Sequence, residues 1–373
     1  MVVLDEVTHK PGGFTKRSLI PALEEEASVI FIHIGRKHQY FGKAGVSHVH
    51  SDTLPWKSLE SSNRALTCRA MRPPAVTPRS LRVQLVLFNN QFRFLVQTVQ
   101  GLIAAAAVAR SNGSLSRIEL AIGDSSTDPC ISEEQERGII GNALDNGFER
   151  AWYTFFGANL GSAGGSNALA EGAETDCLLI LNPDTYPSPW MLHRMLSSLR
   201  DGVGIVEARQ LPIEHPKEYD AHTGDVSWAS GACSMFMRHV FEEVGGYDTD
   251  HFFLHCDDVD ISWRVKLAGY RVVMEPSATT LHHKPINLSG NIEPPYAERY
   301  HGALGKLMLA TRYGAEDVFE NTTSWIRANG DDAQQQAVDD FEARAAEGRI
   351  PDLIPDGVTV AQFVGTEYAK HRF

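Results

Sequence analysis

With 373 residues, the chain is long enough to bury a large hydrophobic core, as one domain or as two. Its composition, 43% hydrophobic and 22% charged, is typical of a folded globular protein. A formal net charge of −13 argues against a nucleic-acid partner, because the phosphate backbone would be repelled. An acidic protein can still bind a phosphate-bearing ligand through a metal ion or backbone N–H groups.

The cysteines and the apolar segments indicate a reducing compartment. The chain has five scattered cysteines without a CxxC pair, so a disulfide framework is not expected. The start, "MVVLDEVTHKPGG", lacks the apolar centre of a signal peptide. The longest apolar run, 101–109, has about half the length needed to span a bilayer. We therefore expect a cytoplasmic location, and leave open a peripheral contact with the inner face of the cell membrane.

The first eighty residues carry few structural signals. The stretch "ASVIFIHI" (27–34) predicts a strand, and the Pro-rich "MRPPAVTPRS" (71–80) predicts a boundary. This N-terminal part could cover a sheet edge or mediate assembly into a homo-oligomer, and the sequence does not decide between these roles.

From residue 82, strand-like and helix-like segments alternate. Apolar, β-branched segments predict four strands, at 83–88, 117–122, 151–156 and 177–181. Segments with helical spacing or capping signals predict helices at 91–110, 132–146, 163–173 and 188–200. This alternation predicts an α/β fold with a mostly parallel, Rossmann-like sheet that is flanked by helices.

Polar residues follow three of these strands directly. Asp124 follows the second, Asn159 and Gly161 follow the third, and Asp184 follows the fourth. Open parallel sheets bind ligands outside the carboxyl ends of their strands, so we expect a ligand site here. Solvated loops also carry such residues, but their recurrence at one edge favours a site.

Two of these loops allow both a structural and a functional reading. In "GDSSTDP" (123–129), Asp124 or Asp128 could accept hydrogen bonds from a base or ribose, or could serve only turn geometry. In "NLGSAGGSN" (159–167), glycines let the backbone approach a phosphate at a helix N-terminus, or serve tight packing. The spacing matches neither a dinucleotide fingerprint nor a P-loop.

The buried strand in "LLILNPDT" (178–185) runs directly into Asp184. A hard cation takes oxygen ligands, often one or two carboxylates together with substrate phosphates. We therefore predict that Asp184 holds a divalent ion and, through it, a diphosphate. The alternative is that Asp184 caps a turn before Pro187.

Three acids begin the predicted helix in "HFFLHCDDVDISWRVKLAGY" (251–270), which should end at Gly269. Asp260 and Arg264 are spaced to pair on one face, which makes Asp260 structural. Asp257 and Asp258 could be caps, but two adjacent carboxylates exceed what a cap needs. A neighbouring like charge raises a carboxyl pKa, which suits a general base.

Adjacent histidines occur at 282 and 283 in "EPSATTLHHKP" (275–285). On an extended segment they point to opposite faces, so at most one enters a site. His48 and His50 share a face, but without a third ligand in the sequence we interpret them as structural.

In this order and spacing, the stretches resemble family 2 glycosyltransferases, especially the bacterial rhamnosyltransferase-like branch. The resemblance runs from about Val83 to His283. Seven stretches carry it: "LVLFNN" (85–90), "GDSSTD" (123–128), "NLGSAGGSN" (159–167), "LILNPDT" (179–185), "WASGACSMFMRHVFEEVGGYD" (228–248), "FFLHCDDVDISWR" (252–264) and "HH" (282–283). It implies a GT-A catalytic domain at 81–290, with an N-terminal extension (1–80) and a mainly helical C-terminal extension (291–373).

The resemblance also implies roles for single residues. Asp184 resembles the second acid of the Asp-x-Asp motif, which binds the metal and the donor diphosphate, while Asn182 stands where the first acid often is. His282 resembles the histidine that completes the metal site. Asp258 resembles the catalytic base, with Asp257 in the place of a usual Glu.

The remaining implied residues concern the two substrates. Asp124 or Gly123 stands where the family has an Asp that contacts uracil or thymine. Trp228 and Gly231 lie in the segment that usually lines the donor-sugar and acceptor pocket. The donor-binding residues predicted in total are Phe88, Asn89, Asp124, Asn159, Gly161, Asn167, Asn182 and Asp184.

The family's activity would be the transfer, with inversion, of a sugar from a UDP- or dTDP-linked donor to a glycan or lipid-linked acceptor. This would serve a bacterial surface polysaccharide. A carboxylate would take the proton of the acceptor hydroxyl, and Mn²⁺ or Mg²⁺ would neutralise the leaving diphosphate. An imidazole ligand favours Mn²⁺.

Two other functions remain to be weighed. A sugar-nucleotide nucleotidyltransferase would carry a Gly-rich, basic loop after the first strand, which "FNNQFRF" lacks. A non-catalytic glycan-binding protein would not need Asp184, Asp257, Asp258 and His282 together.

The stretches after the region of resemblance predict helices. Residues 295–314 predict an amphipathic helix that packs on the catalytic domain, or docks an acceptor or membrane, and residues 324–348 predict a charged helical segment.

Overall fold

The computed structural model describes residues 77–200, 202–284 and 294–372. All of them belong to one compact unit, Met71–Phe373. The strand predicted at 27–34 and the histidines His48 and His50 lie outside the described residues.

The centre of the described part is a mixed sheet of eight strands in the order β3-β2-β1-β4-β7-β6-β8-β5. The strands are β1 (Arg79–Leu87), β2 (Leu115–Asp124), β3 (Arg150–Phe155), β4 (Cys177–Leu181), β5 (Thr185–Pro187), β6 (Val203–Leu211), β7 (Cys233–Met237) and β8 (Arg271–His282). Strands β3, β2, β1 and β4 are parallel, as predicted, and β7 runs antiparallel between β4 and β6. The short β5 pairs antiparallel with β8 at the sheet edge.

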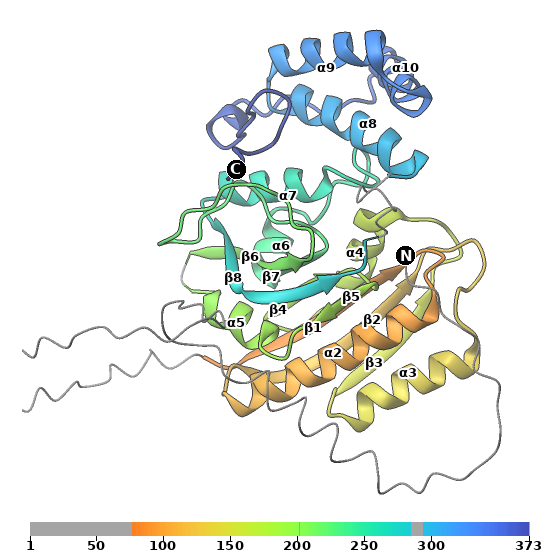
Figure 1. The fold of residues 1–373 in the computed structure, drawn as a ribbon, viewed down its shortest axis with the longest axis vertical. Helices are drawn as coiled ribbons and strands as arrows, with labels where there is room; N and C mark the ends of the chain where they lie inside the picture. The colour runs from red at the N-terminus through yellow and green to blue at the C-terminus, as the bar shows by residue number, and fades with distance from the viewer. Residues whose placement is uncertain (1–76, 201, 285–293, 373) are drawn as a thin grey trace, which may run out of the picture. The chain divides into compact units, whose positions relative to one another are not determined.

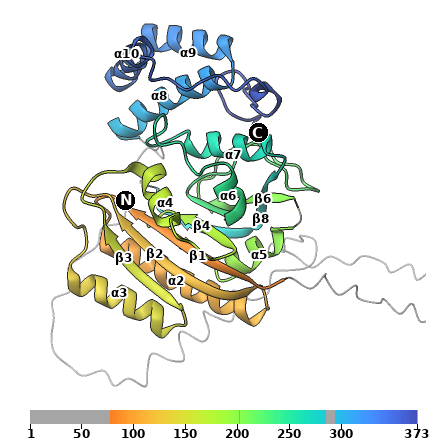
Figure 2. The same ribbon diagram turned by 180° about the vertical axis from the view of Figure 1, so that it is seen from behind.

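Helices cover both faces of the sheet, which confirms the predicted layered α/β architecture (Figures 1 and 2). One face carries α2 (Phe92–Ser111), α3 (Glu133–Asp145) and α5 (Met191–Ser198). The other carries α4 (Gly161–Ala170), α6 (Arg238–Glu243) and α7 (Asp257–Leu267). The four strands and four helices predicted up to residue 200 are all present, with boundaries shifted by a few residues.

A capping signal explains the start of α3, and core packing explains the apolar sequence of α2. Ser132 begins α3 with a capping box, in which its side chain accepts from the backbone N–H of Gln135. Helix α2 is, within the described residues, the one helix long and apolar enough by length and composition to cross a membrane. Its Leu95, Val99 and Leu102 are buried in the core under the sheet, so packing accounts for its apolar character.

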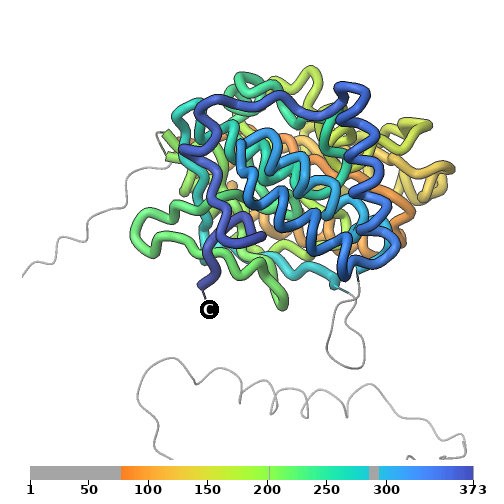
Figure 3. The backbone as a smooth tube through the Cα atoms, turned by 90° about the horizontal axis from the view of Figure 1, so that it is seen from above, coloured from red at the N-terminus to blue at the C-terminus, as the bar shows by residue number. Residues whose placement is uncertain are grey.

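Beyond α7 the chain continues into three helices, α8 (Tyr296–Arg312), α9 (Glu316–Asn329) and α10 (Asp332–Ala346), which lie side by side (Figure 3). The helix expected at 295–314 is α8, and it packs on α7 through a second hydrophobic core that includes Trp263 and Leu307. The charged segment expected at 324–348 is divided between α9 and α10, because Asp331 starts a new helix with its own capping box.

Candidate functional site

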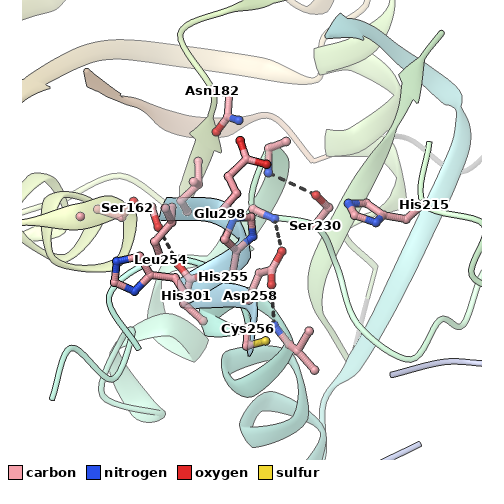
Figure 4. A pocket seen from close by; sticks show the side chains of 18 of the residues that line it. Ser162, Asn182, His215, Ser230, Leu254, His255, Cys256, Asp258, Glu298 and His301 are labelled. Atoms are coloured by element: carbon pink, nitrogen blue, oxygen red, sulfur yellow. Dashed lines mark hydrogen bonds between the residues drawn. The ribbon is translucent and has the colours of Figure 1, made fainter. Parts of the chain in front are cut away.

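A cavity of about 900 Å³ opens at the carboxyl ends of β1 and β4, between the sheet, the start of α7 and the start of α8. Figure 4 shows residues from these separate elements, among them Asn182, Asp258 and Glu298, around the same space. Ten of the residues predicted from the sequence line it: Phe88, Asn159, Gly161, Asn182, Asp184, Trp228, Gly231, Asp257, Asp258 and His282.

The pairing of β5 with β8 brings Asp184 and His282 together. Thr185 is the register partner of His282. Asp184 directly precedes Thr185 and therefore lies next to the imidazole. The distance from Asp184 Oδ1 to His282 Nε2 is 3.3 Å. The Asn182 side-chain nitrogen lies 3.4 Å from the same ring atom. His283 is exposed on the other face, against Phe94, as alternation along a strand requires.

Gln210 on β6 fixes the orientation of this imidazole. Its Oε1 lies 2.8 Å from His282 Nδ1, and both side chains are buried. A carbonyl oxygen accepts a hydrogen bond, so Nδ1 is the donor to Gln210 and Nε2 is the ring atom that faces Asp184. This is the arrangement in which a histidine binds a metal ion. The sequence offered no signal for Gln210.

The Asp184–His282 pair fits a single divalent ion. Adjacent ligands of an octahedral ion at about 2.1 Å lie about 3 Å apart, close to the observed separation. Among the described residues, no group of three His, Cys, Asp or Glu side chains forms a metal site by itself. The remaining coordination positions would therefore fall to other oxygens, as is usual where a metal binds substrate phosphates.

The acid pair begins α7 on the same cavity. Asp258 accepts hydrogen bonds from the backbone N–H of Gly231 (3.0 Å) and of Val259 (2.9 Å). Asp257 is buried and accepts from the Ser162 hydroxyl at 2.9 Å. Burial, together with the adjacent charge of Asp258, raises the pKa of Asp257 to about 7. Near neutral pH the pair therefore holds a proton on the buried member.

The third acid of the motif has a structural role, as predicted. Asp260 is fully buried and contacts Arg264 (2.7 Å) and Arg312 (2.8 Å). The pair with Arg312 ties α7 to α8, and the pair with Arg264 lies within α7. Gly269 follows the end of α7 with a positive φ of 89°, as expected of a C′ glycine.

Asp124 lies beside the cavity and does not line it. It is fully buried and accepts from the backbone N–H groups of Ser126 (2.9 Å) and Cys130 (2.8 Å) and from the Tyr153 hydroxyl (2.7 Å). Burial alone would raise its pKa, but these hydrogen bonds outweigh it and lower the pKa of Asp124. In this arrangement Asp124 shapes the loop after β2, and the exposed Asn89 donates its N–H to Ser126 at 2.8 Å.

Asn167 is also placed away from the cavity lining. Its side chain accepts from the Tyr247 N–H at 2.9 Å and donates to the Tyr247 carbonyl at 2.8 Å, which fixes that loop. Gly161, in contrast, lines the cavity with φ +67°. A Cβ there would lie 2.2 Å from the Phe253 carbonyl oxygen, so only glycine fits between α4 and that loop.

Sequence reasoning missed the polar side chains deep in the cavity. Gln84 on β1 is buried and lines the cavity, and neither of its amide atoms has a hydrogen-bond partner within the described structure. The hydroxyl of Ser125 is in the same situation. Buried polar atoms are normally satisfied, so these atoms are suited to a bound ligand. A glutamine within the apolar strand "VQLVLF" was the available signal.

Lys217 is another part of the lining that sequence reasoning missed, and it forms a buried ion pair with Glu207. Lys217 Nζ lies 2.9 Å from Glu207 Oε1 and 3.5 Å from the centre of the Trp228 ring. Burial lowers the pKa of Lys217 and raises that of Glu207, and the mutual attraction opposes both shifts. His215 packs against the same indole, and burial lowers its pKa to about 3, so it is neutral.

Comparisons with known proteins add the family context. No protein-family model matches the chain. A stretch of 123 residues is 34% identical to the N-acetylglucosaminyl-diphospho-decaprenol L-rhamnosyltransferase of Mycobacterium tuberculosis, covering 28% of this chain and 36% of that protein. Another, of 97 residues, is 31% identical to the poly-β-1,6-N-acetyl-D-glucosamine synthase of Staphylococcus aureus, covering 26% of this chain and 23% of that protein. The chain thus spans 36% of the first of these relatives and 23% of the second.

Among solved structures, GalNAc-T7 with UDP, GalNAc and Mn²⁺ aligns with a TM-score of 0.52 at 14% identity, covering 74% of this chain and 56% of that chain. At that identity the likeness concerns the fold, which is the GT-A fold expected. The named relatives confirm the resemblance to family 2 glycosyltransferases.

Proposed function

We propose that this chain, with its GT-A fold and its resemblance to family 2 glycosyltransferases, is an inverting, metal-dependent glycosyltransferase. The donor would be a UDP- or dTDP-linked sugar, and the acceptor a hydroxyl of a glycan or lipid-linked glycan. The relatives' names support this choice of acceptor, since one specifies a diphospho-decaprenol-linked acceptor and the other a polysaccharide product. Synthesis of a bacterial surface polysaccharide, at the inner face of the cell membrane, would fit both.

One observation carries the proposal: a single cavity holds both the Asp184–His282 pair and the Asp257–Asp258 pair. A transferase needs one group that holds the leaving diphosphate and another that takes the proton of the attacking hydroxyl, on opposite sides of the bond that breaks. One pair would hold the departing diphosphate, and the other would accept the proton of the attacking hydroxyl. The elements that supply them, β4–β5, β8 and α7, are far apart in the sequence and meet only in the folded chain.

The donor diphosphate would lie at the Asp184 end. Asp184 and His282 would hold Mn²⁺ or Mg²⁺, and the imidazole favours Mn²⁺. When bound, the ion would neutralise the negative charge that grows on the leaving diphosphate. The start of α4, where Gly161 keeps the backbone open, would place N–H groups toward the phosphates.

Asp258 would act as the general base. Two backbone N–H groups already bind its carboxylate, which fixes its direction and leaves further lone pairs for the acceptor hydroxyl. As the hydroxyl oxygen forms its bond to the anomeric carbon, the bond from that carbon to the diphosphate oxygen breaks and the proton moves to Asp258. This in-line displacement inverts the anomeric carbon without a covalent enzyme intermediate.

Asp257 would lower the total negative charge of the acid pair. Its raised pKa means that near pH 7 it holds a proton for part of the time, so the pair carries less than two charges in a buried place. Both carboxylates line the cavity, and Asp258 is the less buried of the two.

The test is a thermal-shift screen of nucleotide sugars with and without Mn²⁺, followed by a transfer assay with the donor that binds. A true donor raises the melting temperature in a metal-dependent manner, because it binds only the folded state. Transfer to a glycan acceptor, with inverted configuration in the product by NMR, is the expected result. Pyrophosphate release from a nucleoside triphosphate, or no metal-dependent nucleotide binding at all, would overturn the proposal.

A further inference from the structure

Two consecutive residues just before the acid pair have left-handed backbone conformations. His255 has φ 64° and Cys256 has φ 62°, and neither is a glycine. Cys256 is the N-cap of α7, so this turn sets the direction in which Asp257 and Asp258 leave it. Such conformations are strained for residues other than glycine and persist only where the surroundings hold them.

Helix α8 packs against this turn from one side. Its Gly305 lies so close to the turn that a Cβ there would be 2.9 Å from Cys256 Cβ and 3.1 Å from the His255 carbonyl oxygen. Real Cβ atoms do not approach other atoms this closely, so any other residue would push the turn or the helix aside. The close approach therefore requires glycine at this point of α8.

The segment 367–372 contacts the same turn from a second side. The Tyr368 hydroxyl lies 3.2 Å from Cys256 Sγ, and burial raises the pKa of this thiol to about 12, so the contact joins two neutral groups. The Tyr368 carbonyl accepts from the Ser227 hydroxyl at 2.8 Å, beside Trp228 of the cavity wall. His371 forms a β-bridge with Lys217, which fixes the segment along the other wall.

We infer that α8 and the segment 367–372 position the acid pair, by holding the His255–Cys256 turn from two sides. Both elements lie outside the stretch, Val83 to His283, on which the resemblance rests. Gly305 and Tyr368 are thus positioning residues that act through Cys256. The chemistry that they would serve rests on the proposed function, whereas the positioning itself can be measured without it.

The amide of Gly231 gives a direct readout, because it donates to the carboxylate of Asp258. If the turn relaxes, Asp258 moves and this amide loses its acceptor. We therefore propose to measure hydrogen exchange at Gly231, by NMR or on the peptide that contains it, in the full chain. The variants are Gly305→Ala and Tyr368→Phe, where Tyr368→Phe removes only the hydroxyl.

Two matched controls carry the same chemical changes elsewhere. Gly141→Ala adds a Cβ to α3 at a position with nothing within 4 Å. Tyr270→Phe removes a hydroxyl that donates to Glu243 at 2.8 Å, on the exposed side of α6. Neither residue lines the cavity.

We expect exchange at Gly231 to rise about tenfold in Gly305→Ala and Tyr368→Phe, with native circular dichroism and no change in the two controls. Once a donor is known, kcat should fall about tenfold or more and the acid limb of its pH profile should shift, while donor affinity stays the same. Should Gly305→Ala not fold, Tyr368→Phe alone decides.

Unchanged exchange at Gly231 in Tyr368→Phe would overturn the inference, as would an equal rise in Tyr270→Phe. Failure of the proposed function would look different. The wild-type chain would then show no transfer with any donor, while the exchange experiment would still report whether the turn is held.

Discussion

His282 Nε2 lies 3.3 Å from Asp184 Oδ1, although α5, β6, β7, α6 and α7 lie between β5 and β8 in the chain. The relationship depends on a three-residue edge strand and on one hydrogen bond that the ring makes to the side-chain oxygen of Gln210. His282, the last residue of β8, is buried in the cavity, whereas the adjacent His283 is exposed, and this difference gives the first prediction.

Replacing His282 by Ala should abolish metal-dependent donor binding, because it removes one of the two ligands and leaves Asp184 alone. Titration calorimetry of a UDP- or dTDP-sugar with and without Mn²⁺ measures this. The matched control is His283→Ala, whose side chain is exposed on the other face. Equal losses of affinity in both variants would contradict a metal site at Asp184 and His282.

Gln210→Leu should weaken Mn²⁺ binding about 10–100-fold, since the ring of His282 loses the acceptor that fixes its tautomer. Mn²⁺ affinity can be read by electron paramagnetic resonance of the free ion, without any activity assay. Leucine retains much of the side-chain volume, so the fold should survive. Unaltered Mn²⁺ affinity in this variant would show that the hydrogen bond has no orienting role.

Asp258→Asn should lower kcat by about 10²–10⁴-fold, because an amide cannot take the acceptor proton. Donor affinity, measured by calorimetry, should remain within a few-fold, since the donor diphosphate lies at the Asp184 end of the cavity in our proposal. Asp352→Asn, at an exposed position near the C-terminus, is the control and should behave as the wild type. A fully active Asp258→Asn enzyme would remove Asp258 from the role of base.

Stability should depend on pH in opposite ways at Asp257 and Asp124. The pKa of Asp257 is raised to about 7 on folding, so ionisation disfavours the folded state and stability is lost as pH rises from about 4 to 7. Asp257→Asn should therefore stabilise the protein more at pH 8 than at pH 4. Denaturant unfolding at both values measures this.

The pKa of Asp124 is lowered, so its contribution is present above its ordinary pKa and is lost as pH falls further. Asp124→Asn should destabilise at pH 7 and have less effect near pH 3. The same sign of pH dependence in both variants would refute the two assignments.

Asn167→Ala should destabilise the fold by about 1–3 kcal/mol, because both backbone groups of Tyr247 lose their partners. Urea unfolding measures this, with the exposed Asn329→Ala as a control that should change stability by less than about 0.5 kcal/mol. Donor affinity should be retained once the protein is folded. A selective loss of donor affinity at full stability would instead place Asn167 in the donor site, as its motif suggested.

The sequence predicted the first half of the domain well, because its signals are local. Strands such as 177–181 and helices such as 91–110 have strong apolar patterns, and all of them are present. The antiparallel β7 and the three-residue β5 were not predicted, since their existence depends on partners that are remote in the sequence. The break between α9 and α10 at Gly330 was likewise not anticipated.

For the site, the sequence identified groups with unusual chemistry, such as Asp184, but not the groups that support them. Gln210, Lys217 and Tyr368 are ordinary residues in sequence context, and each acquires its role only from what it contacts. Asp124 shows the reverse case, because a carboxylate at a strand end turned out to be fully occupied by its own loop. The type and the position of a residue could be read from the sequence, but not whether its side chain was already engaged in hydrogen bonds within the protein.

Strand β8 contains an irregularity whose effect reaches the Asp184–His282 pair. Its register with β6 jumps between Ala208↔Glu275 and Arg209↔Thr279, so extra residues are looped into β8 ahead of His282. This insertion sets the phase of the side chains that follow. Deleting one of those residues would turn the imidazole of 282 outward and bring a different side chain to Asp184. The length of the chain ahead of residue 282 would then decide whether the two side chains meet, even with both residues still present in the sequence.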